Sequence, residues 1–439
     1  MATDVVTCFL RNRGQVLLNH RADDAPTYPG RWAGISGCVE PGETPEIVAR
    51  REIDEETGLT DPTLIRSGGV QSVHGDDPDR EWAVQPFLFD VRTRAVEDST
   101  EHAETEWCQP TAILRRDTVP GLWRTYRRVG PTVRTVVADD EHGSAYISVR
   151  ALEVLRDRAG LIAVEQAGTK DDDWAELADL AVRLRESRPG MAALANRVNR
   201  AIATADGRTP AAVETAAIAG IERALSADEN AAAAAAERVT GERVLTLSRS
   251  GTVLAALREG DPAAVFVAES RPAREGVGVA EQLAGTSLVT LHADGAIADV
   301  LARQDVDLVI VGVDTLRPDG GVVNKTGTRT AAVAADHEGV PVYAAAASDK
   351  VATGPVSLES AAGAGIYDGD GGIDVYNPLF DETPPELVTG AITERGTLLP
   401  EEVAEIAEQL RSLADWDGDG DGDNNGDDDG NGAETGAPR

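Results

Sequence analysis

Up to residue 132, apolar residues fall into short runs of the kind that forms β-strands. The runs at residues 5–10 and 15–18 predict a hairpin, because the polar residues 11–14 between them end in a glycine. Further strands are expected at residues 32–37, 64–70, 81–91 and 104–108, and a helix is expected at residues 119–129. This mixture of strands and helices indicates an α/β domain over residues 1–132.

The spacing of apolar residues then changes to the 3.6-residue period of amphipathic helices. Helices are expected at residues 142–159, 174–187, 191–204 and 211–239, the last with a run of six alanines. Four helices in succession predict a helical subdomain over residues 142–240, and residues 133–141 are interpreted as a linker.

From residue 241 onward, apolar strands alternate with helices. Strands are expected at residues 244–247, 264–268, 287–291, 307–313 and 340–345, with helices at 253–259, 277–284, 297–303 and 328–338. Continuous apolar strands joined by crossover helices predict a Rossmann-like, parallel, doubly wound sheet over residues 241–414. Such a sheet binds ligands at the carboxyl ends of its strands. The whole chain is therefore expected to be of the α/β class.

The composition is strongly acidic, with 41 Lys and Arg against 76 Asp and Glu among 439 residues and a formal net charge of −35. Lysine occurs only at Lys170, Lys325 and Lys350. This style resembles that of proteins from extreme halophiles, where salt screens the repulsion between like charges. The charge argues against nonspecific binding to nucleic acids or to acidic membranes.

Cysteine usage and hydropathy favour a cytoplasmic protein. Cys8, Cys38 and Cys108 are an odd number without metal-type spacing, which is typical of a reducing compartment. No apolar run approaches the roughly 20 residues that a membrane-spanning helix needs. Residues 415–439 are acidic and of low complexity, so we expect them to be disordered.

Residues 37–60 contain the most specific motif of the chain. Thr44 is suited to cap a helix, Pro45 to occupy its first position and Gly58 to end it. On this helix Glu52, Glu55 and Glu56 have the i, i+3, i+4 spacing that places side chains on one face. These like charges repel, and Arg51, which is expected to pair with Glu55, relieves only part of the repulsion. A divalent cation such as Mg²⁺ would relieve the rest. The alternative is a solvated acidic face.

The same residues fill all nine specified positions of the pattern G-x5-E-x7-R-E-U-x-E-E-x-G-U, where U is aliphatic, from Gly37 to Leu59. The stretch therefore resembles the Nudix box. The resemblance implies an α/β/α sandwich that hydrolyses a nucleoside diphosphate linked to another group. It also implies that Glu52, Glu55 and Glu56 hold Mg²⁺ or Mn²⁺, that Glu56 is the base for the attacking water, that Arg51 orients the glutamates and that Glu43 supports the metal.

Short polar motifs follow the predicted strands of the second sheet. They occupy residues 247–252, 269–272, 312–314, 320–328 and 377–385, and a related Ser-Arg-Pro motif occupies residues 187–189. Lys325 lies in a glycine-rich turn that opens a predicted helix, where backbone N–H groups favour a phosphate. Arg271 offers a forked donor for the same purpose.

Together these motifs resemble the family of the translation initiation factor 2B α, β and δ subunits, which includes ribose-1,5-bisphosphate isomerase and methylthioribose-1-phosphate isomerase. The resemblance implies a sugar-phosphate or nucleotide site, a proton-shuttling carboxylate at Asp314, and a homodimer or higher oligomer formed through this domain. The implied substrate-binding residues are Arg188, Ser248, Ser250, Arg271, Asn324 and Lys325. The isomerases have a cysteine where this chain has Ser248, and a serine does not readily supply the same acid–base chemistry.

The leading hypothesis is an Mg²⁺-dependent hydrolase of an ADP-ribose-like or nucleoside triphosphate substrate, fused to a domain that binds a sugar phosphate or nucleotide. One alternative is a non-catalytic, nucleotide-sensing regulatory protein that joins an initiation factor 2B-like assembly. Another is a ribose-1,5-bisphosphate isomerase that works through Asp314 and an acid other than cysteine.

Overall fold

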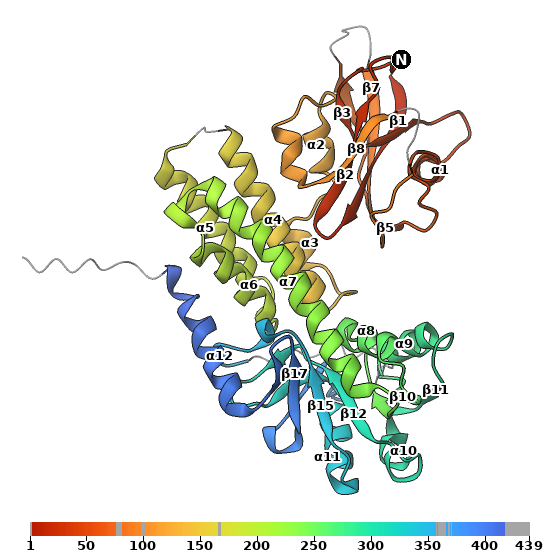
Figure 1. The fold of residues 1–439 in the computed structure, drawn as a ribbon, viewed down its shortest axis with the longest axis vertical. Coiled ribbons are helices and arrows are strands. Elements are labelled where there is room, and N and C mark those ends of the chain that lie inside the picture. The colour runs from red at the N-terminus through yellow and green to blue at the C-terminus, as the bar shows by residue number, and fades with distance from the viewer. Residues whose placement is uncertain are drawn as a thin grey trace, which may run out of the picture.

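The computed structural model places a mixed sheet, a group of helices and a largely parallel sheet one after another along the chain (Figure 1). It describes residues 2–417 except residues 76–80, 98–101, 166–167, 357, 359–365, 368 and 370. Residues 418–439, most of the tail expected to be disordered, lie outside the described residues, whereas Asp415–Asp417 form a 3-10 turn. In the described part of the chain, no helix combines the length and the apolar character needed to cross a bilayer.

The first sheet has eight strands and two flanking helices. Its central path has the order β3-β2-β1-β7-β5, with β4 paired to β1, β6 to β7 and β8 to β2. The strands are β1 (Thr3–Asn12), β2 (Gln15–Arg21), β3 (Trp32–Ala33), β4 (Ile35–Cys38), β5 (Thr63–Ser67), β6 (Gln71–His74), β7 (Glu81–Asp90) and β8 (His102–Cys108). The helices are α1 (Pro45–Thr57) and α2 (Leu122–Tyr126).

Alternate side chains of β1 pack on opposite faces of this sheet. Cys8 belongs to a core that includes Ile53 of α1, whereas Phe9 belongs to a second core that includes Leu122 and Tyr126 of α2. The sheet is therefore covered by one helix on each face, as in the expected α/β/α sandwich.

Several sequence-based boundaries of this domain need correction, and the strand β6 was not expected. The strand expected at residues 32–37 is two strands, because the chain changes partner at Gly34: β3 pairs with β2 and β4 pairs with β1. A Cβ at Gly34 would lie 2.9 Å from the carbonyl oxygen of Cys8, so only glycine fits this crossing. β1 extends through the expected turn to Asn12, and the helix expected at residues 119–129 is reduced to α2.

The helical part contains α3 (Val133–Val137), α4 (Ser144–Glu165), α5 (Lys170–Glu186), α6 (Ala192–Ala203) and α7 (Pro210–Val239). The expected linker thus contains a short helix, α3, which Thr132 caps together with Thr135. The long helix α7 runs from the helical part down to the parallel sheet (Figure 1). Its residue Ile221 lies in the helical core and its residue Val239 lies in a core of the second sheet, so one helix belongs to both.

The second sheet has the strand order β11-β10-β9-β12-β15-β17-β18, with only β18 antiparallel to its neighbour. Its strands are β9 (Arg243–Thr246), β10 (Ala264–Ala268), β11 (Val289–His292), β12 (Leu308–Gly312), β15 (Val342–Ala345), β17 (Gly390–Thr393) and β18 (Gly396–Leu398). Its helices are α8 (Gly251–Glu259), α9 (Glu275–Leu283), α10 (Ile297–Arg303), α11 (Thr328–Glu338) and α12 (Pro400–Ser412). The order reverses between β9 and β12, which makes their carboxyl ends the topological switch point.

The sequence did not predict β17, β18 or a small antiparallel sheet made of β13 (Thr315–Leu316), β14 (Val322–Lys325) and β16 (Phe380–Thr383). These strands have two to four residues each, too few for a periodic pattern to develop. The small sheet nevertheless carries Asn324 and Lys325, two of the expected ligand-binding residues.

The turn between β1 and β2 docks on the helical part. Nη1 of Arg156 in α4 donates to the carbonyl oxygen of Gly14 at 2.5 Å, and Arg13 forms ion pairs with Glu222 and Glu229 of α7. A Cβ at Gly14, whose φ is 74°, would lie 2.9 Å from Ile221. Glycine is therefore required both by the backbone and by the close approach of α7.

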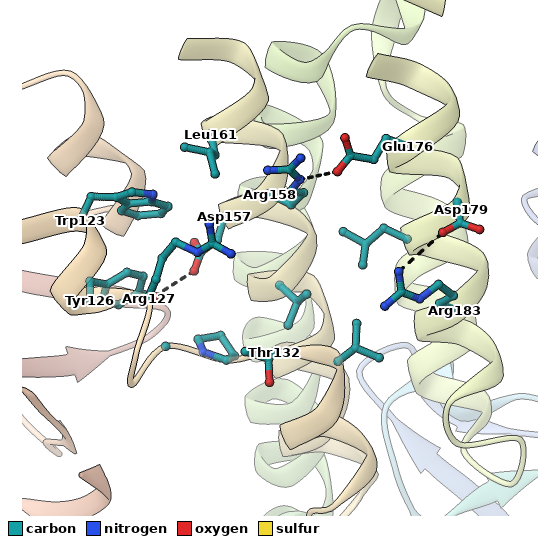
Figure 2. Close-up of a pocket in the computed structure, with 15 residues that line it drawn as sticks. Trp123, Tyr126, Arg127, Thr132, Asp157, Arg158, Leu161, Glu176, Asp179 and Arg183 are labelled. Atoms are coloured by element: carbon teal, nitrogen blue, oxygen red, sulfur yellow. Dashed lines mark hydrogen bonds and ion pairs between the residues drawn. The ribbon is translucent and has the colours of Figure 1, made fainter. Parts of the chain in front are cut away.

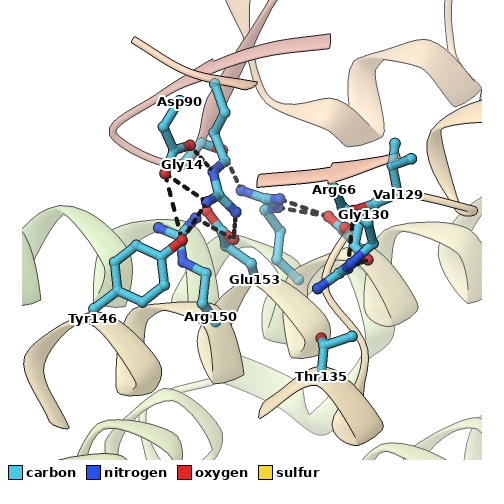
Figure 3. A network of polar contacts seen from close by, with 12 residues as sticks. Gly14, Arg66, Asp90, Val129, Gly130, Thr135, Tyr146, Arg150 and Glu153 are labelled. Atoms are coloured by element: carbon cyan, nitrogen blue, oxygen red, sulfur yellow. Dashed lines mark hydrogen bonds and ion pairs between the residues drawn. The ribbon is translucent and has the colours of Figure 1, made fainter. Parts of the chain in front are cut away.

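Beside this turn, Arg11 is the centre of a buried polar network. Its partners Asp90, Tyr146 and Glu153 lie close together in Figure 3. Arg11 lies 2.6 Å from Asp90 of β7 and 3.3 Å from Glu153 of α4, and it donates to the Tyr146 hydroxyl at 2.8 Å. The Arg11 side chain is 4% exposed and that of Glu153 is fully buried. A charge buried among such partners cannot be removed without leaving the partners uncompensated.

We therefore predict that Arg11→Met lowers the free energy of unfolding by roughly 3–5 kcal/mol, the usual cost of removing one member of a buried ion pair. Arg13→Met is the matched control, because Arg13 also joins the two domains but its partners are about 60% exposed. Its cost should be about 0–1 kcal/mol. Chemical denaturation followed by circular dichroism measures both, and equal costs for the two variants would contradict a structural role for the buried network.

Candidate functional site

Helix α1 follows the bounds that the sequence predicts. Thr44 occupies the N-cap position with an extended backbone, although its side chain makes no capping hydrogen bond. Pro45 begins the helix, and Gly58 ends it with a φ of 70° and an N–H donated to the carbonyl oxygen of Asp54. The helix packs on the sheet through residues that include Val48 and Ile53, which fixes the direction of its acidic side chains.

The three glutamates of α1 lie in different environments. Glu56 is buried, Glu52 is half-buried and Glu55 is exposed. The buried Glu56 carboxylate accepts hydrogen bonds from Nε2 of His102 at 2.7 Å and from Nδ2 of Asn19 at 3.0 Å. His102 comes from β8 and Asn19 from β2, and neither has a local sequence signal; only the pairing of these strands brings both to α1.

Glu52 and Glu43 share Arg51. Nη2 of Arg51 donates to Glu52 at 3.2 Å, and Nη1 donates to Glu43. The expected Arg51–Glu55 pair is therefore wrong, because Glu43 and Glu52 lie within reach of the guanidinium in the folded chain. Glu43 also accepts the backbone N–H of Glu40 at 3.1 Å.

Gly37 makes room for the carboxylate of Glu52. A Cβ built at this position would overlap the Glu52 side chain. Gly37 lies on β4, which pairs with β1 beneath α1, so the first glycine of the motif and its glutamate meet across the strand–helix interface. This contact gives a physical reason for a glycine 15 positions before Glu52.

The carboxylates of α1 form a region of unbalanced negative charge. The pKa of Glu52 is raised by burial and by the charges of Glu56 and Glu55, while Arg51 opposes the shift. Burial of the thiol is the main reason why the pKa of Cys8 is raised. The charges of Glu56 and Glu52 raise it further.

Among the described residues, no group of three or more His, Cys, Asp or Glu side chains is arranged to hold a metal ion. The chemistry of the donors still fits Mg²⁺, which takes carboxylate oxygens from one or two residues and keeps water and substrate oxygens as its other ligands. Glu52 and Glu56 supply such oxygens.

A second candidate site lies at the switch point of the parallel sheet. The Ser248 hydroxyl, just after β9, donates to Oε2 of Glu275 at 2.6 Å, and Oε1 of Glu275 is 3.3 Å from Nζ of Lys325. Two expected ligand-binding residues, Ser248 and Lys325, are thus joined through Glu275. Glu275 begins α9 and was missed because nothing near it in the sequence indicates a site.

Other expected residues surround the same strand ends. Ser250 caps α8, and a Cβ at Gly312 would lie 2.6 Å from its hydroxyl oxygen, so the ends of β9 and β12 are in close contact. Asn324 is buried and donates to Thr328 at 2.9 Å. Asp314 lies two residues after the end of β12.

Lys350 is a buried cation beside Asp314 that the motif analysis did not single out. Its Nζ donates to the carbonyl oxygen of Val313 at 2.5 Å. Burial lowers the pKa of Lys350, and the charge of Asp314 opposes that shift. The end of β12 therefore combines an acid and an amine.

Two expected phosphate ligands have other partners. Arg188 donates to the carbonyl oxygens of Val136 and Asp139 near α3. Arg271 is 62% exposed and lies 3.3 Å from Glu269. A phosphate would have to compete with these contacts.

A cleft of about 240 Å³ lies between α2 and the helices α4 and α5 (Figure 2). Trp123 and Leu161 face it, and its acids are paired: Glu176 with Arg158, Asp179 with Arg183. None of the residues expected to bind a ligand lines this cleft. It belongs to the junction between the two domains.

Two family models match the chain. The Initiation factor 2 subunit family matches residues 140–400, more than half of the chain, and the NUDIX domain matches residues 1–129.

Two relatives illustrate the likeness of the second part. The ribose 1,5-bisphosphate isomerase of Haloferax volcanii is 32% identical over 309 residues, which cover 64% of this chain and 94% of that protein. The methylthioribose-1-phosphate isomerase of Heliobacterium modesticaldum is 39% identical over 181 residues, which cover 38% of this chain and half of that protein.

Among solved structures, the translation initiation factor eIF-2B of Pyrococcus horikoshii has a TM-score of 0.53 at 24% identity. The match covers 62% of this chain and 96% of that one, and it concerns the fold alone. The chain therefore belongs to the initiation factor 2 subunit family and carries a NUDIX domain in front of the family's characteristic region.

Proposed function

We propose that the N-terminal domain hydrolyses a nucleoside diphosphate linked to another group, with Mg²⁺ or Mn²⁺ as cofactor. One observation carries the proposal: Glu52 and Glu56 repel each other on the inner side of α1, and Arg51 is the cation that opposes this repulsion. A divalent ion would be held by these two residues, with Glu55 at the exposed rim. When bound, such an ion neutralises negative charge on the diphosphate as its bond breaks.

The side chains around Glu56 support its role as the base. His102 and Asn19 both donate to the same carboxylate oxygen, Oε2, which leaves Oε1 to accept a proton from water. Arg51 donates to both Glu43 and Glu52, and this bridge fixes the direction of the Glu52 carboxylate. In this proposal Glu52 and Glu56 bind the ion, Glu56 also takes the proton, and Asn19, Arg51 and His102 are positioning residues.

We also propose that the second domain binds a phosphorylated sugar or nucleotide through Lys325, Asn324 and the loop at Ser248. Its likeness to ribose 1,5-bisphosphate isomerases supports this ligand class. The Ser248 hydroxyl is engaged with Glu275 and lacks the acidity of a thiol, so we infer binding without isomerisation. A dimer through this domain remains an expectation from the family.

The main alternative is that the NUDIX domain senses a nucleotide without cleaving it. The buried hydrogen bonds from His102 and Asn19 to Glu56 favour the enzyme, because a sensor has no need for a carboxylate held at such a cost of burial. Absence of turnover by the wild-type protein on every diphosphate derivative and nucleoside triphosphate, with Mg²⁺ or Mn²⁺ present, would favour the sensor.

Glu52→Gln should raise the melting temperature of the metal-free protein at neutral pH. Because the folded-state pKa of Glu52 lies above its unfolded value, its ionised form is a net cost to the fold. That cost appears as pH rises from the unfolded-state pKa through the folded-state pKa, and glutamine removes it. Differential scanning calorimetry in EDTA measures the shift. Glu46→Gln on the same helix is the control, since Glu46 pairs with Arg50 on the surface; an equal rise in both variants would contradict the charge argument.

Glu56→Gln should lower kcat by about a hundredfold or more, as expected on losing a general base, while the fold is retained. Turnover of ADP-ribose, other nucleoside diphosphate derivatives and nucleoside triphosphates with Mg²⁺ is followed by chromatography of the products. Glu46→Gln should keep wild-type activity. Wild-type turnover by the Glu56→Gln variant would remove Glu56 from the role of base, and activity confined to triphosphates would contradict a diphosphate-linked substrate.

The full chain should bind ribose 1,5-bisphosphate and leave it unchanged. Calorimetry reports the binding and phosphorus NMR reports the chemical state of the bound and free sugar. Lys325→Gln should weaken this binding at least tenfold through the loss of a charged hydrogen-bond donor. Arg303→Gln, at an exposed ion pair on α10, is the control. Conversion of the sugar to a ketose would establish the isomerase instead, and unaltered binding by the Lys325→Gln variant would move the site elsewhere.

A further inference from the structure

A cleft of about 450 Å³ opens between the N-terminal domain and the start of α4. Arg11, Arg66 and Leu88 form the wall from the N-terminal domain. The opposite wall consists of the segment around residues 131–142 together with Tyr146 and Arg150 of α4. Both domains are therefore needed to form the cleft, and none of the expected site residues lines it.

The guanidinium groups of Arg11 and Arg150, one from each wall of this cleft, approach the same carboxylate. Nη1 of Arg150 lies 2.9 Å from Oε2 of Glu153, the same oxygen that Arg11 approaches at 3.3 Å. The Arg150 guanidinium also lies over the ring of Tyr146, 4.8 Å from its centroid. Figure 3 shows Tyr146, Arg150, Glu153 and Asp90 gathered at this point.

The positive charges of Arg66 and Arg150 are incompletely balanced. Within the described part of the chain, the hydrogen bonds of Arg66 go from Nη1 to the carbonyl oxygens of Val129 and Gly130, at 3.0 and 2.9 Å, and to no carboxylate. Nε of Arg150 is buried without a hydrogen-bond partner among these residues. Burial lowers the pKa of both Arg66 and Arg150, and the nearby charge of Arg11 lowers each further. Arginines that repel one another stand out in a chain with a net charge of −35.

Two of the three acids on the opposite wall, Asp139 and Asp140, have side-chain partners of their own, and the third, Glu141, is exposed. Asp139 accepts from the ring Nδ1 of His142 at 2.9 Å and from the backbone N–H of Glu141 at 3.1 Å. Asp140 is 88% exposed and lies 3.3 Å from Arg188. Among the described residues, Asp139 and Asp140 form ion pairs with neither Arg66 nor Arg150, although the charge of Asp139 favours the charged form of Arg66.

We propose that this cleft binds the phosphate group of a small phosphate ester, with Arg66 and Arg150 as its ligands. Planar guanidinium groups match phosphate oxygens in both geometry and charge. The volume falls within the roughly 300–1,000 Å³ typical of small-molecule pockets, which suits a sugar phosphate or a mononucleotide. The site is distinct from the carboxylates of α1 and does not depend on hydrolysis there.

The wall of the cleft is also connected to the second domain. Arg188 donates to the carbonyl oxygens of Val136 and Asp139, and Arg249, next to Ser248, donates to the carbonyl oxygen of Glu141. These hydrogen bonds link the wall of the cleft to the loop that follows β9. The cleft is placed to report a ligand to both halves of the chain.

Isothermal titration of the metal-free, full-length protein tests the proposal. Inorganic phosphate, ribose 5-phosphate and AMP are titrated at low ionic strength in EDTA, so that no metal ion contributes to phosphate binding. At least one ester should bind more tightly than inorganic phosphate, and Arg66→Gln and Arg150→Gln should each weaken it about tenfold or more, the effect of losing a charged hydrogen bond. Equal affinity for inorganic phosphate would contradict an ester as the ligand.

Arg124→Gln is the matched control, because Arg124 also donates to a backbone carbonyl oxygen, that of Ser72 at 2.8 Å, but lies outside the cleft. The Arg124→Gln variant should bind the ester with the affinity of the wild type. Wild-type affinity in both cleft variants, or loss of binding in Lys325→Gln alone, would overturn the proposal and assign the ester to the second domain. Hydrogen exchange on the wild type needs no variant: the ester should protect residues 131–150, and unchanged exchange there would also overturn it.

Discussion

Buried arginines, bonded to carboxylates or to backbone carbonyl oxygens, hold the domains of this acidic chain together. Arg11 joins β1 to Asp90 and Glu153, Arg156 reaches from α4 to the turn at Gly14, and Arg197 of α6 lies 3.1 Å from Asp349 near the parallel sheet. Such pairs are screened by salt much less than surface pairs are. They tie the NUDIX domain to α4, and the helices in turn to the second sheet, at fixed positions.

Among the described residues, like charges are only partly compensated at α1 and at the domain junction, and both places are candidate ligand sites. At α1, Glu52 and Glu56 repel each other and suit a divalent cation. At the domain junction, Arg66 and Arg150 carry charge that no carboxylate fully balances and suit a phosphate ester. Repulsion between like charges at these two sites lowers the stability of the fold. The buried ion pairs elsewhere offset this loss, because functional sites commonly reduce stability and the surrounding structure compensates.

The sequence was sufficient where a signal is local. The helix from Pro45 to Gly58, the main strands of both sheets and helices such as α10 and α11 follow from capping residues and from periodicity within a few turns. For the candidate site, only the residues within the Nudix box, from Gly37 to Leu59, could be predicted. The partners of Glu56, which are His102 and Asn19, depend on the pairing of β2 with β8 across more than eighty residues.

The same limit explains the errors. Arg51 was expected to pair with Glu55 one helical turn away, but the fold brings Glu43 from the preceding loop to its guanidinium. Glu275 between Ser248 and Lys325 belongs to a third segment whose position depends on the strand order of the parallel sheet. The junction cleft combines side chains from two domains, so no pattern within either domain indicates it. Local chemistry was readable, whereas contacts between distant segments were not.

The central claim is that the carboxylates of α1 form a cation site. Anomalous diffraction from crystals of the full-length protein grown with Mn²⁺ tests it directly. The account predicts a manganese peak in contact with Glu52 and Glu56, with Arg51 still bonded to Glu43 and His102 still bonded to Glu56. A map with no manganese peak at α1 would contradict it.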